Sequence, residues 1–479
     1  MTMLAGLSRY HPRYVRSVVY MLQSSEYMPT DFFRWYFRVE DFTRVERRKH
    51  LVKTKKALVL LAAGWVVQLA WCAAIVRVAL FGAGASRYAL AFLMALAMPY
   101  VVACGLMALV VAGHACVRKP MERMALWRTQ KRLARHGALR IAIAGSFGKT
   151  TMREILKTVL AQDKRVAAPP HSHNTIAGIA RFVQKLRGDE DVLIFELVEY
   201  YPGDVRRLCA MMRPHIGIIT GVNEAHLQKF KNLERTRKTI FELADYIGEG
   251  PLYINGESAM AGAHAAKSHK VYTREGVSDW RVRSANADLG GTQCTFMHAD
   301  NTEIAVRTRL LGLHHVGSLA AAADIASDLG MSHEQIRQGI ANIRPFSHRL
   351  EAKTDASGVT ILDDSYNGNP DGVRVIIEFL ASLKGRRRFY VTPGLVEMGE
   401  KTKTVHREIG ASLAGAGIEH VVLIKNSATP YIAQGLADAG YAGKVAWFDD
   451  AASAYASLPH LTVEGDVVVL QNDWPDQYA

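Results

Sequence analysis

Cysteine is scarce in this sequence, with five residues in 479, and none of them stands in a Cys-x-x-Cys pair. Closely spaced cysteine pairs are typical of zinc knuckles, and an even, regularly spaced set is typical of a secreted disulfide framework. The sequence argues against both and favours a reducing cytoplasm. Internal repeats and low-complexity tracts are also absent. A chain of this length and apolar content predicts two or three folded domains.

Charged residues are missing from two apolar runs, residues 57–76 and 88–113. A helix of about 20 apolar residues can cross about 30 Å of hydrocarbon. Only a short turn around residues 82–87 separates the runs, so the sequence predicts an α-helical transmembrane hairpin. The alternative is a buried core hairpin of a soluble protein. A cleavable signal peptide is disfavoured, because the first run begins late and a second one follows it.

The net charge of +14 is concentrated around this hairpin, with a basic block before residue 57 and more Lys and Arg after Val117. Such a block could bind nucleic acid, but its place beside apolar runs favours a membrane surface, with inner-membrane lipid as the partner. By the positive-inside rule both ends face the cytoplasm, which predicts a multi-pass protein of the cytoplasmic membrane. We expect residues 1–56 to form amphipathic helices on the membrane, residues 57–118 the hairpin, and residues 119–138 a helical linker.

A glycine-rich stretch follows the linker: Gly145-Ser146-Phe147-Gly148-Lys149-Thr150-Thr151. It lies between an apolar strand pattern and a helical pattern, as a phosphate-binding P-loop does. The usual P-loop has a further glycine where this chain has Ile143. The glycines let backbone N–H groups point at an anion near a helix N-terminus. Lys149 can reach terminal phosphates and the Thr150 hydroxyl can hold Mg²⁺; the alternative is an ordinary glycine turn.

Short apolar strands alternate with helical patterns from residue 138 onward, which predicts a mostly parallel sheet covered by helices. Residues 251 to about 310 look like a strand-rich insertion. Pro345 precedes a second α/β unit, so we expect domains over 139–345 and 346–479. Polar clusters follow several strands, where ligand groups collect in open α/β sheets. These clusters are Asn174-Thr175-Ile176-Ala177-Gly178, the run that begins at Glu196, the run around His226, the run Asp363 to Pro370, and the Glu397-Met398-Gly399-Glu400 run.

The order of these motifs resembles that of the Mur ligases, the ATP-dependent amide-bond-forming enzymes of peptidoglycan synthesis. The resemblance runs from about Ile141 to the C-terminus. It rests on the Gly-x-x-Gly-Lys-Thr-Thr loop, the Tyr-Asn-x-Asn-Pro run and the Glu-Met-Gly-Glu run. It implies a P-loop-type parallel-sheet ATPase domain and a C-terminal Rossmann-like α/β domain, here preceded by the hairpin.

The resemblance also implies a reaction that needs ATP and Mg²⁺ and forms ADP. ATP would phosphorylate a carboxylate of a cell-wall precursor, and the amine of an amino acid or dipeptide would attack the acyl phosphate. Cations must neutralise the negative charges of the carboxylate and the triphosphate when the two groups meet. The specific activity that the resemblance implies is the addition of D-alanyl-D-alanine.

The same resemblance assigns roles to single residues. The catalytic residues are Lys149, His226 and Lys238, the last as a candidate for the family's modified lysine. The implied ATP-binding residues are Gly145, Ser146, Gly148, Lys149, Thr150, Thr151, Arg349, Asp363 and Asp364. Thr150 is the implied ligand of a first Mg²⁺, and Glu196 and His226 are the implied ligands of a second. The implied substrate-binding residues are Asn174, Thr175, Tyr366, Asn367 and Asn369.

Three features depart from the family pattern. The family carries a lysine, modified to a metal-bridging carbamate, where this chain has Ile240, and Lys238 lies on another face of the same predicted helix. His315 and Ser318 replace two asparagines that help to hold adenine. The hairpin stands where the family has a small domain that grips a UDP-sugar. These departures keep two alternatives open: a ligase that acts on a lipid-linked acceptor, and a nucleotide-binding envelope scaffold without catalysis.

Overall fold

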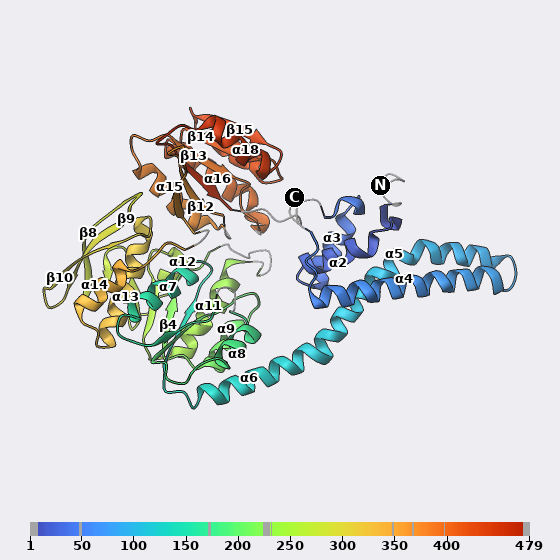
Figure 1. The fold of residues 1–479 in the computed structure, drawn as a ribbon, viewed down its shortest axis with the longest axis horizontal. Coiled ribbons are helices and arrows are strands. Elements are labelled where there is room, and N and C mark those ends of the chain that lie inside the picture. Colours follow the sequence, from blue (N-terminus) through green and yellow to red (C-terminus); the bar gives the residue numbers. More distant parts are fainter. Residues whose placement is uncertain are drawn as a thin grey trace. The chain divides into compact units, whose positions relative to one another are not determined.

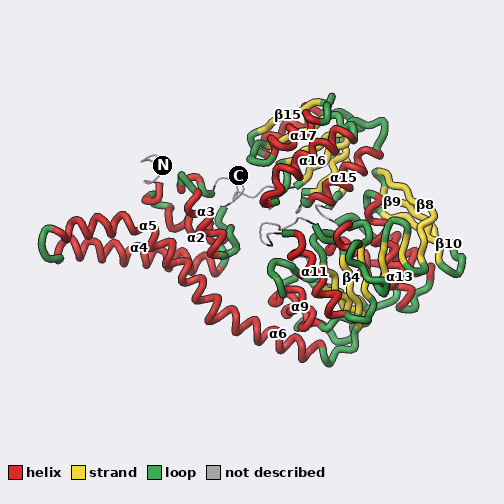
Figure 2. The backbone as a smooth tube through the Cα atoms, turned by 180° about the vertical axis from the view of Figure 1, so that it is seen from behind, coloured by secondary structure: helices red, strands yellow, loops and turns green. Residues whose placement is uncertain are grey.

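The computed structural model describes residues 8–46, 50–170, 174–223, 230, 232–346, 349–365, 368–396 and 398–472. The chain divides into two compact units, which we call the N-terminal unit, up to Arg123, and the α/β unit, from Met124 onward. Figure 1 labels the elements of both, and Figure 2 shows them from behind, coloured by secondary structure.

The N-terminal unit is helical in its described part. Its elements are η1 (Ser8–Tyr10), α2 (Tyr14–Ser24), α3 (Pro29–Arg38), η2 (Phe42–Arg44), α4 (Lys55–Phe81), α5 (Ser86–Gly113) and the π-helical turn η3 (His114–Arg118). Helices α4 and α5 run side by side as a hairpin (Figures 1 and 2). Both predicted apolar runs lie within them. Helix α6 (Lys119–Leu133) continues into the α/β unit, as the helical pattern of the linker predicts.

Two helices are long and apolar enough to cross a membrane: α4, and the continuous helix from Ser86 to Leu133 that begins with α5. That finding rests on length and composition alone, which core helices and signal sequences can also satisfy. Many of their large apolar side chains are exposed. These include Val59, Val66, Leu69, Leu80, Phe92 and Leu93, each more than 60% exposed. So many exposed large apolar side chains on two neighbouring helices are unusual on a soluble monomer.

Helix α2 packs against the hairpin, and the prediction that residues 1–56 form amphipathic helices on the membrane stays a prediction. Val15, Val18 and Met21 are fully buried. A Cβ atom at Gly64 of α4 would lie 2.5 Å from a Val15 methyl group, so the helices approach closely. The apolar residues of α2 are spread around most of the helix, which is typical of a buried helix.

The α/β unit opens with a six-stranded parallel sheet in the order β2-β3-β1-β4-β5-β6. The strands are β1 (Leu139–Ala144), β2 (Val166–Ala167), β3 (Val192–Glu196), β4 (Ile216–Ile219), β5 (Leu252–Asn255) and β6 (Lys270–Tyr272). The accompanying helices are α7 (Lys149–Leu160), α8 (Ile176–Val183), α9 (Asp204–Met212), α11 (Leu233–Ile247), α12 (Ala259–Gly262), α13 (Val316–Asp328) and α14 (His333–Ala341). The parallel-sheet central domain is therefore confirmed.

Strand β1 contributes side chains to both cores of this domain, because successive side chains of a strand point to opposite faces. Ile141 and Ile143 join the cluster built by α7, α13 and α14. Ala142 and Ala144 join the cluster built by α8, α9 and α11. Covering both faces buries the strand from Ile141 to Ala144, as a parallel sheet requires.

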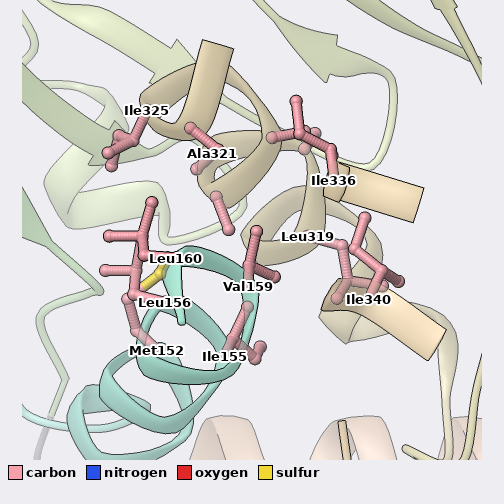
Figure 3. Close-up of a cluster of buried hydrophobic side chains, with 14 of the residues drawn as sticks. Met152, Ile155, Leu156, Val159, Leu160, Leu319, Ala321, Ile325, Ile336 and Ile340 are labelled. Atoms are coloured by element: carbon pink, nitrogen blue, oxygen red, sulfur yellow. The ribbon is translucent and has the colours of Figure 1, made fainter. Parts of the chain in front are cut away.

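Helix α7 is held by apolar packing along the side that faces α13 and α14 (Figure 3). The labelled side chains of α7 are Met152, Ile155, Leu156, Val159 and Leu160, and they meet Leu319, Ala321, Ile325, Ile336 and Ile340. Each of these residues is fully buried. This packing fixes the helix whose N-terminus carries the glycine-rich loop.

A four-stranded antiparallel sheet, in the order β10-β9-β8-β7, follows the parallel one. Its strands are β7 (Gly276–Val277), β8 (Trp280–Asp288), β9 (Gly291–His298) and β10 (Glu303–Thr308). The segment predicted as a strand-rich insertion over 251–310 does contain strands throughout, but the separate sheet begins only at Gly276. Residues 252–272 complete the parallel sheet as β5 and β6, because a strand pattern alone does not show which sheet a strand joins. The 3-10 turn η4 (Leu313–His315) leads into α13.

The C-terminal part of the α/β unit has a second six-stranded sheet, in the order β11-β12-β16-β13-β14-β15. Its strands are β11 (Glu351–Thr354), β12 (Thr360–Asp364), β13 (Arg388–Thr392), β14 (His420–Ile424), β15 (Lys444–Phe448) and β16 (Val467–Gln471). Its helices are α15 (Pro370–Ser382), η5 (Gly399–Lys401), α16 (Thr402–Gly415), α17 (Thr429–Asp438) and α18 (Ala451–Leu461). All neighbouring strands are parallel except β11 and β12. The predicted C-terminal α/β domain is confirmed.

Candidate functional site

The glycine-rich loop connects β1 to the N-terminus of α7. Gly145 and Gly148 have φ of +147° and +73°, conformations that glycine adopts without strain. The Ser146 N–H donates to the Gly221 carbonyl at 2.9 Å, which ties the loop to the end of β4. Thr151 lies in the first turn of α7, where unsatisfied N–H groups and the helix dipole favour an anion.

Lys149, the first residue of α7, folds its side chain back over the loop. Its ammonium donates to the Gly145 carbonyl and to Glu199 Oε1, the latter at 2.6 Å. The Lys149 side chain is 15% exposed and that of Glu199 only 3%. The ammonium is therefore held at the mouth of the loop by a buried carboxylate.

Thr150 lies at the centre of a cluster drawn from three segments of the chain. Its hydroxyl donates to Glu196 Oε2 at 3.1 Å, at the carboxyl end of β3. It also accepts a hydrogen bond of 3.3 Å from the Arg349 guanidinium, just before β11. Glu196 in addition forms an ion pair of 2.7 Å with Arg153 on α7.

The side chains of these residues are of the kinds that bind a nucleoside triphosphate and Mg²⁺. A hydroxyl and a carboxylate, Thr150 and Glu196, are hard oxygen donors of the kind that Mg²⁺ prefers. Lys149 and Arg349 supply positive charge beside them, and the loop supplies backbone N–H groups. The structure therefore brings together the predicted residues of the loop, Glu196 and Arg349.

The predicted C-terminal residues lie at the end of β12 and the start of α15. Asp363 accepts hydrogen bonds from Ser365, one from the hydroxyl at 2.7 Å. Burial raises the pKa of the Asp364 carboxyl to about 7, although Arg349 lowers it. Asn369 caps α15 through the Gly372 N–H at 3.0 Å.

One polar contact joins this region to the glycine-rich loop. The Asn223 amide donates to Asn369 Oδ1 at 2.8 Å and to Asp371 Oδ2 at 2.9 Å, while its backbone N–H donates to Ser146 Oγ at 3.3 Å. Asn369 therefore reaches the loop through Asn223.

Other predicted residues lie at the start of α8, on α11 or outside the described residues. Thr175 caps α8 by accepting from the Gly178 N–H at 3.2 Å, and Asn174 beside it is half-buried. Lys238 is exposed, whereas Ile240 is fully buried in the core beneath α11. His226, Tyr366 and Asn367 lie outside the described residues.

His314 and His315 occupy the stretch where the sequence departs from the family's asparagines. Their ring centroids are 3.8 Å apart. Burial and the nearby Arg274 together lower the pKa of His314 to about 4, and burial also lowers the pKa of His315. Both rings are therefore neutral at neutral pH.

Two residues of the cluster were not predicted from the sequence: Arg153 and Glu199. Arg153 is 3% exposed although it stands on an amphipathic helix, where an arginine usually faces solvent. Glu199 follows Glu196 by three residues. A second acid just beyond the end of β3 could have marked it in the sequence as a further candidate for the site.

Comparison with known proteins matches two domains in this unit. The Mur ligase middle domain matches residues 143–326, and the Mur ligase glutamate ligase domain matches residues 348–471. UDP-N-acetylmuramoyl-tripeptide–D-alanyl-D-alanine ligase of Mycobacterium tuberculosis is 31% identical over 296 residues, covering 59% of this chain and 58% of the relative. The Escherichia coli enzyme of the same name is 24% identical over 316 residues, covering 64% of this chain and 68% of the relative.

Solved structures share the fold. The MurF ligase from Thermotoga maritima in complex with ADP has a TM-score of 0.65 and 22% sequence identity, and the match covers 74% of this chain and 80% of that one. The chain spans less than two thirds of the length of the mycobacterial relatives. Two matched domains in family order, together more than half of the sequence, show that the chain belongs to the Mur ligase family.

Proposed function

We propose that this protein is an ATP- and Mg²⁺-dependent, ADP-forming amide ligase that joins D-alanyl-D-alanine to a peptidoglycan precursor. The names of the relatives support this activity, although the chain spans only 58% of the mycobacterial ones. The observation that carries the proposal is that the Thr150 hydroxyl is hydrogen-bonded to both Glu196 and Arg349. These contacts place metal-binding oxygens beside a cation from the C-terminal part of the unit.

Each residue of the cluster has a defined task in such a reaction. ATP supplies the phosphoryl group that activates the substrate carboxylate. Lys149 and Arg349 neutralise phosphate charge, which lowers the repulsion between the triphosphate and the incoming carboxylate. Thr150 would hold a first Mg²⁺, and Glu196 and His226 would hold a second one. Asp363 and Asp364 are proposed to contact the nucleotide, and the run from Tyr366 to Asn369 the substrate.

Phosphate release from the purified full-length protein in detergent tests the proposal. ATP and Mg²⁺ are supplied with a panel of acceptors, UDP-linked and lipid-linked, and of amine donors that includes D-alanyl-D-alanine. Release that requires both an acceptor and a donor supports a ligase. Nucleotide binding without release under any combination would favour the alternative of a scaffold.

We further propose that α4 and α5 anchor the ligase in the cytoplasmic membrane. The exposed apolar side chains of both helices support this, as does the basic flank on either side. A membrane anchor would keep the site near a lipid-linked acceptor, which makes such an acceptor the second candidate substrate. The two acceptor classes of the panel distinguish the candidates.

Reporter fusions test the topology of the hairpin. Fusions at Ser8 and at the C-terminus are expected to score cytoplasmic, because basic residues flank both runs on their outer sides. A fusion within the Gly82–Arg87 turn is expected to score on the other side of the membrane. A periplasmic signal at either terminus would contradict the hairpin.

Substitution of Lys238 tests whether it replaces the modified lysine of the family. Lys238→Ala is expected to change phosphate release less than about twofold, because the side chain is exposed on α11 and Ile240 holds the buried position. His226→Ala is expected to be severe if His226 binds the metal. A severe Lys238→Ala defect that short-chain carboxylates rescue would contradict this expectation.

A further inference from the structure

Three potential metal ligands meet in the α/β unit outside the site described above. They are His298 at the end of β9, Asp300 in the turn that follows it, and His333 at the start of α14. One donor atom of each residue lies within 4.8 Å of the donor atoms of the other two. We call these residues the histidine cluster, and none of them has a role in the proposed reaction.

The histidine cluster lies toward the opposite end of α7 from the glycine-rich loop. Gln335, in the first turn of α14 with His333, donates to Asp163 at 3.1 Å, and Asp163 follows the C-terminus of α7. The loop precedes the N-terminus of that helix, whose 12 residues span about 18 Å. The histidine cluster is therefore separate from the proposed nucleotide site.

Both imidazole rings pack against a fully buried tryptophan. The Trp280 ring centroid lies 5.0 Å from that of His298 and 5.5 Å from that of His333, and the two imidazole centroids are 4.9 Å apart. Trp280 and His298 are also direct partners in the pairing of β8 with β9. Packing against a core side chain restricts both imidazole rings, which prearranges them as ligands.

The polar atoms of the histidine cluster make few contacts with protein partners. His298 Nδ1 lies 3.0 Å from Asp300 Oδ1, which also accepts from the Thr302 N–H at 2.8 Å. Within the described part of the chain, the His333 ring forms no hydrogen bond and Asp300 pairs with no lysine or arginine. The cluster thus keeps nitrogen and oxygen lone pairs, and one negative charge, for a cation.

Two imidazole nitrogens and one carboxylate oxygen suit Zn²⁺ better than Mg²⁺, which prefers oxygen ligands alone. Donor atoms about 2.0–2.2 Å from a tetrahedral Zn²⁺ lie about 3.4 Å from one another. His298 and Asp300 are already this close, and a small contraction of the set from its 4.8 Å spread brings all three donors within reach of one ion. A water molecule can fill the fourth position, because the Asp300 side chain is 50% exposed.

We propose that His298, Asp300 and His333 form a Zn²⁺-binding site that fastens the turn between β9 and β10 to α14. The role of the ion is structural. Helix α14 packs against α7 through Ile336 and Ile340 (Figure 3), so the ion braces the layer that supports α7. This inference is independent of the proposed ligase activity.

Zn²⁺ titration of the full-length protein in detergent tests the site. The protein carries no polyhistidine tag, and excess Mg²⁺ fills sites made of oxygen ligands alone. Substitutions that only disturb the support of a metal ligand cost about 10–100-fold in affinity. His333→Ala removes a ligand, so it is expected to weaken the binding of one Zn²⁺ by at least about 100-fold. The exposed Cys104 and Cys116 are common to both proteins, so the difference between them reports on the histidine cluster.

Thermal unfolding gives a second readout, because an ion that binds only the folded protein raises its melting temperature. Zn²⁺ is expected to raise the melting temperature of the wild-type protein by several degrees and to leave that of His333→Ala unchanged. An equal rise in both proteins would overturn the inference.

His269→Ala is the matched control. His269 is also a half-buried histidine of the α/β unit, and its Nδ1 accepts from the Ala266 N–H at 2.9 Å. This variant is expected to bind Zn²⁺ as the wild-type protein does. A loss of Zn²⁺ binding in both histidine variants would assign the effect to a general loosening of the unit and overturn the inference.

Asp300→Asn covers the case in which His333→Ala does not fold. The amide oxygen can still accept from the Thr302 N–H, so the turn is kept while the negative charge is lost. This variant is expected to bind the ion at least about tenfold more weakly. Wild-type Zn²⁺ affinity in Asp300→Asn and His333→Ala alike, or a wild-type protein that binds no Zn²⁺, would overturn the inference and leave the proposed ligase function intact.

Discussion

Lys149→Ala is expected to abolish nucleotide turnover, with a loss of about 100-fold or more, while folding and membrane insertion are retained. The reason is that Lys149 is proposed to bind phosphate groups that the loop aligns, and removing one preorganised charge-stabilising donor typically costs about 10²–10³ in rate. Its side chain is 15% exposed and belongs to none of the described apolar clusters, so its loss creates no core cavity. The loss of its ion pair with the buried Glu199 is expected to lower the melting temperature without preventing folding. Phosphate release and thermal unfolding, measured on the same preparation, check both halves of the expectation.

Lys157→Ala is the control for Lys149→Ala. Lys157 stands on the same helix, is 48% exposed, and pairs only loosely with Glu154 at 3.9 Å. Exposed pairs of this kind contribute little to stability, so the variant is expected to keep full turnover. Unchanged turnover in Lys149→Ala would remove the loop from the mechanism.

Gly145→Ala is expected to have the second-largest effect, through the shape of the loop rather than its charge. Gly145 has φ of +147°, and a Cβ atom there would lie 2.2 Å from Thr220 Oγ1 and 3.1 Å from the Gly221 backbone. Backbone strain and overpacking each cost about 1–3 kcal/mol, so we expect a clear loss of stability together with loss of nucleotide binding. Thermal unfolding and titration with an ATP analogue measure the two effects.

Gly137→Ala is the control for Gly145→Ala. No heavy atom lies within 4 Å of a Cβ atom at Gly137, and its φ is not in the left-handed region. It is expected to bind nucleotide as the wild-type protein does. Wild-type nucleotide affinity and stability in Gly145→Ala would mean that the loop relaxes around the methyl group and that its conformation is not required.

The sequence by itself determined the local elements and the family motifs. The strand before Gly145, the helix after it and the two uncharged runs follow from short-range patterns, because side-chain periodicity and charge are properties of neighbouring residues. The Gly-Lys-Thr motif and the order of the later polar runs pointed to the Mur ligases in the same way. The parallel-sheet central domain and the C-terminal α/β domain were therefore predictable.

Tertiary structure alone decided which of these residues meet. Lys149 and Glu199 are 50 positions apart, and Thr150 and Arg349 are 199 apart, so no local pattern could pair them. Likewise, β5 and β6 pair within the parallel sheet although the sequence placed them in an insertion, and α2 packs onto α4 although its basic flanks suggest a membrane surface. Long-range pairing depends on which apolar faces of helices and strands pack together. A charged side chain such as Glu199 reaches Lys149 only after that packing has brought the end of β3 beside α7.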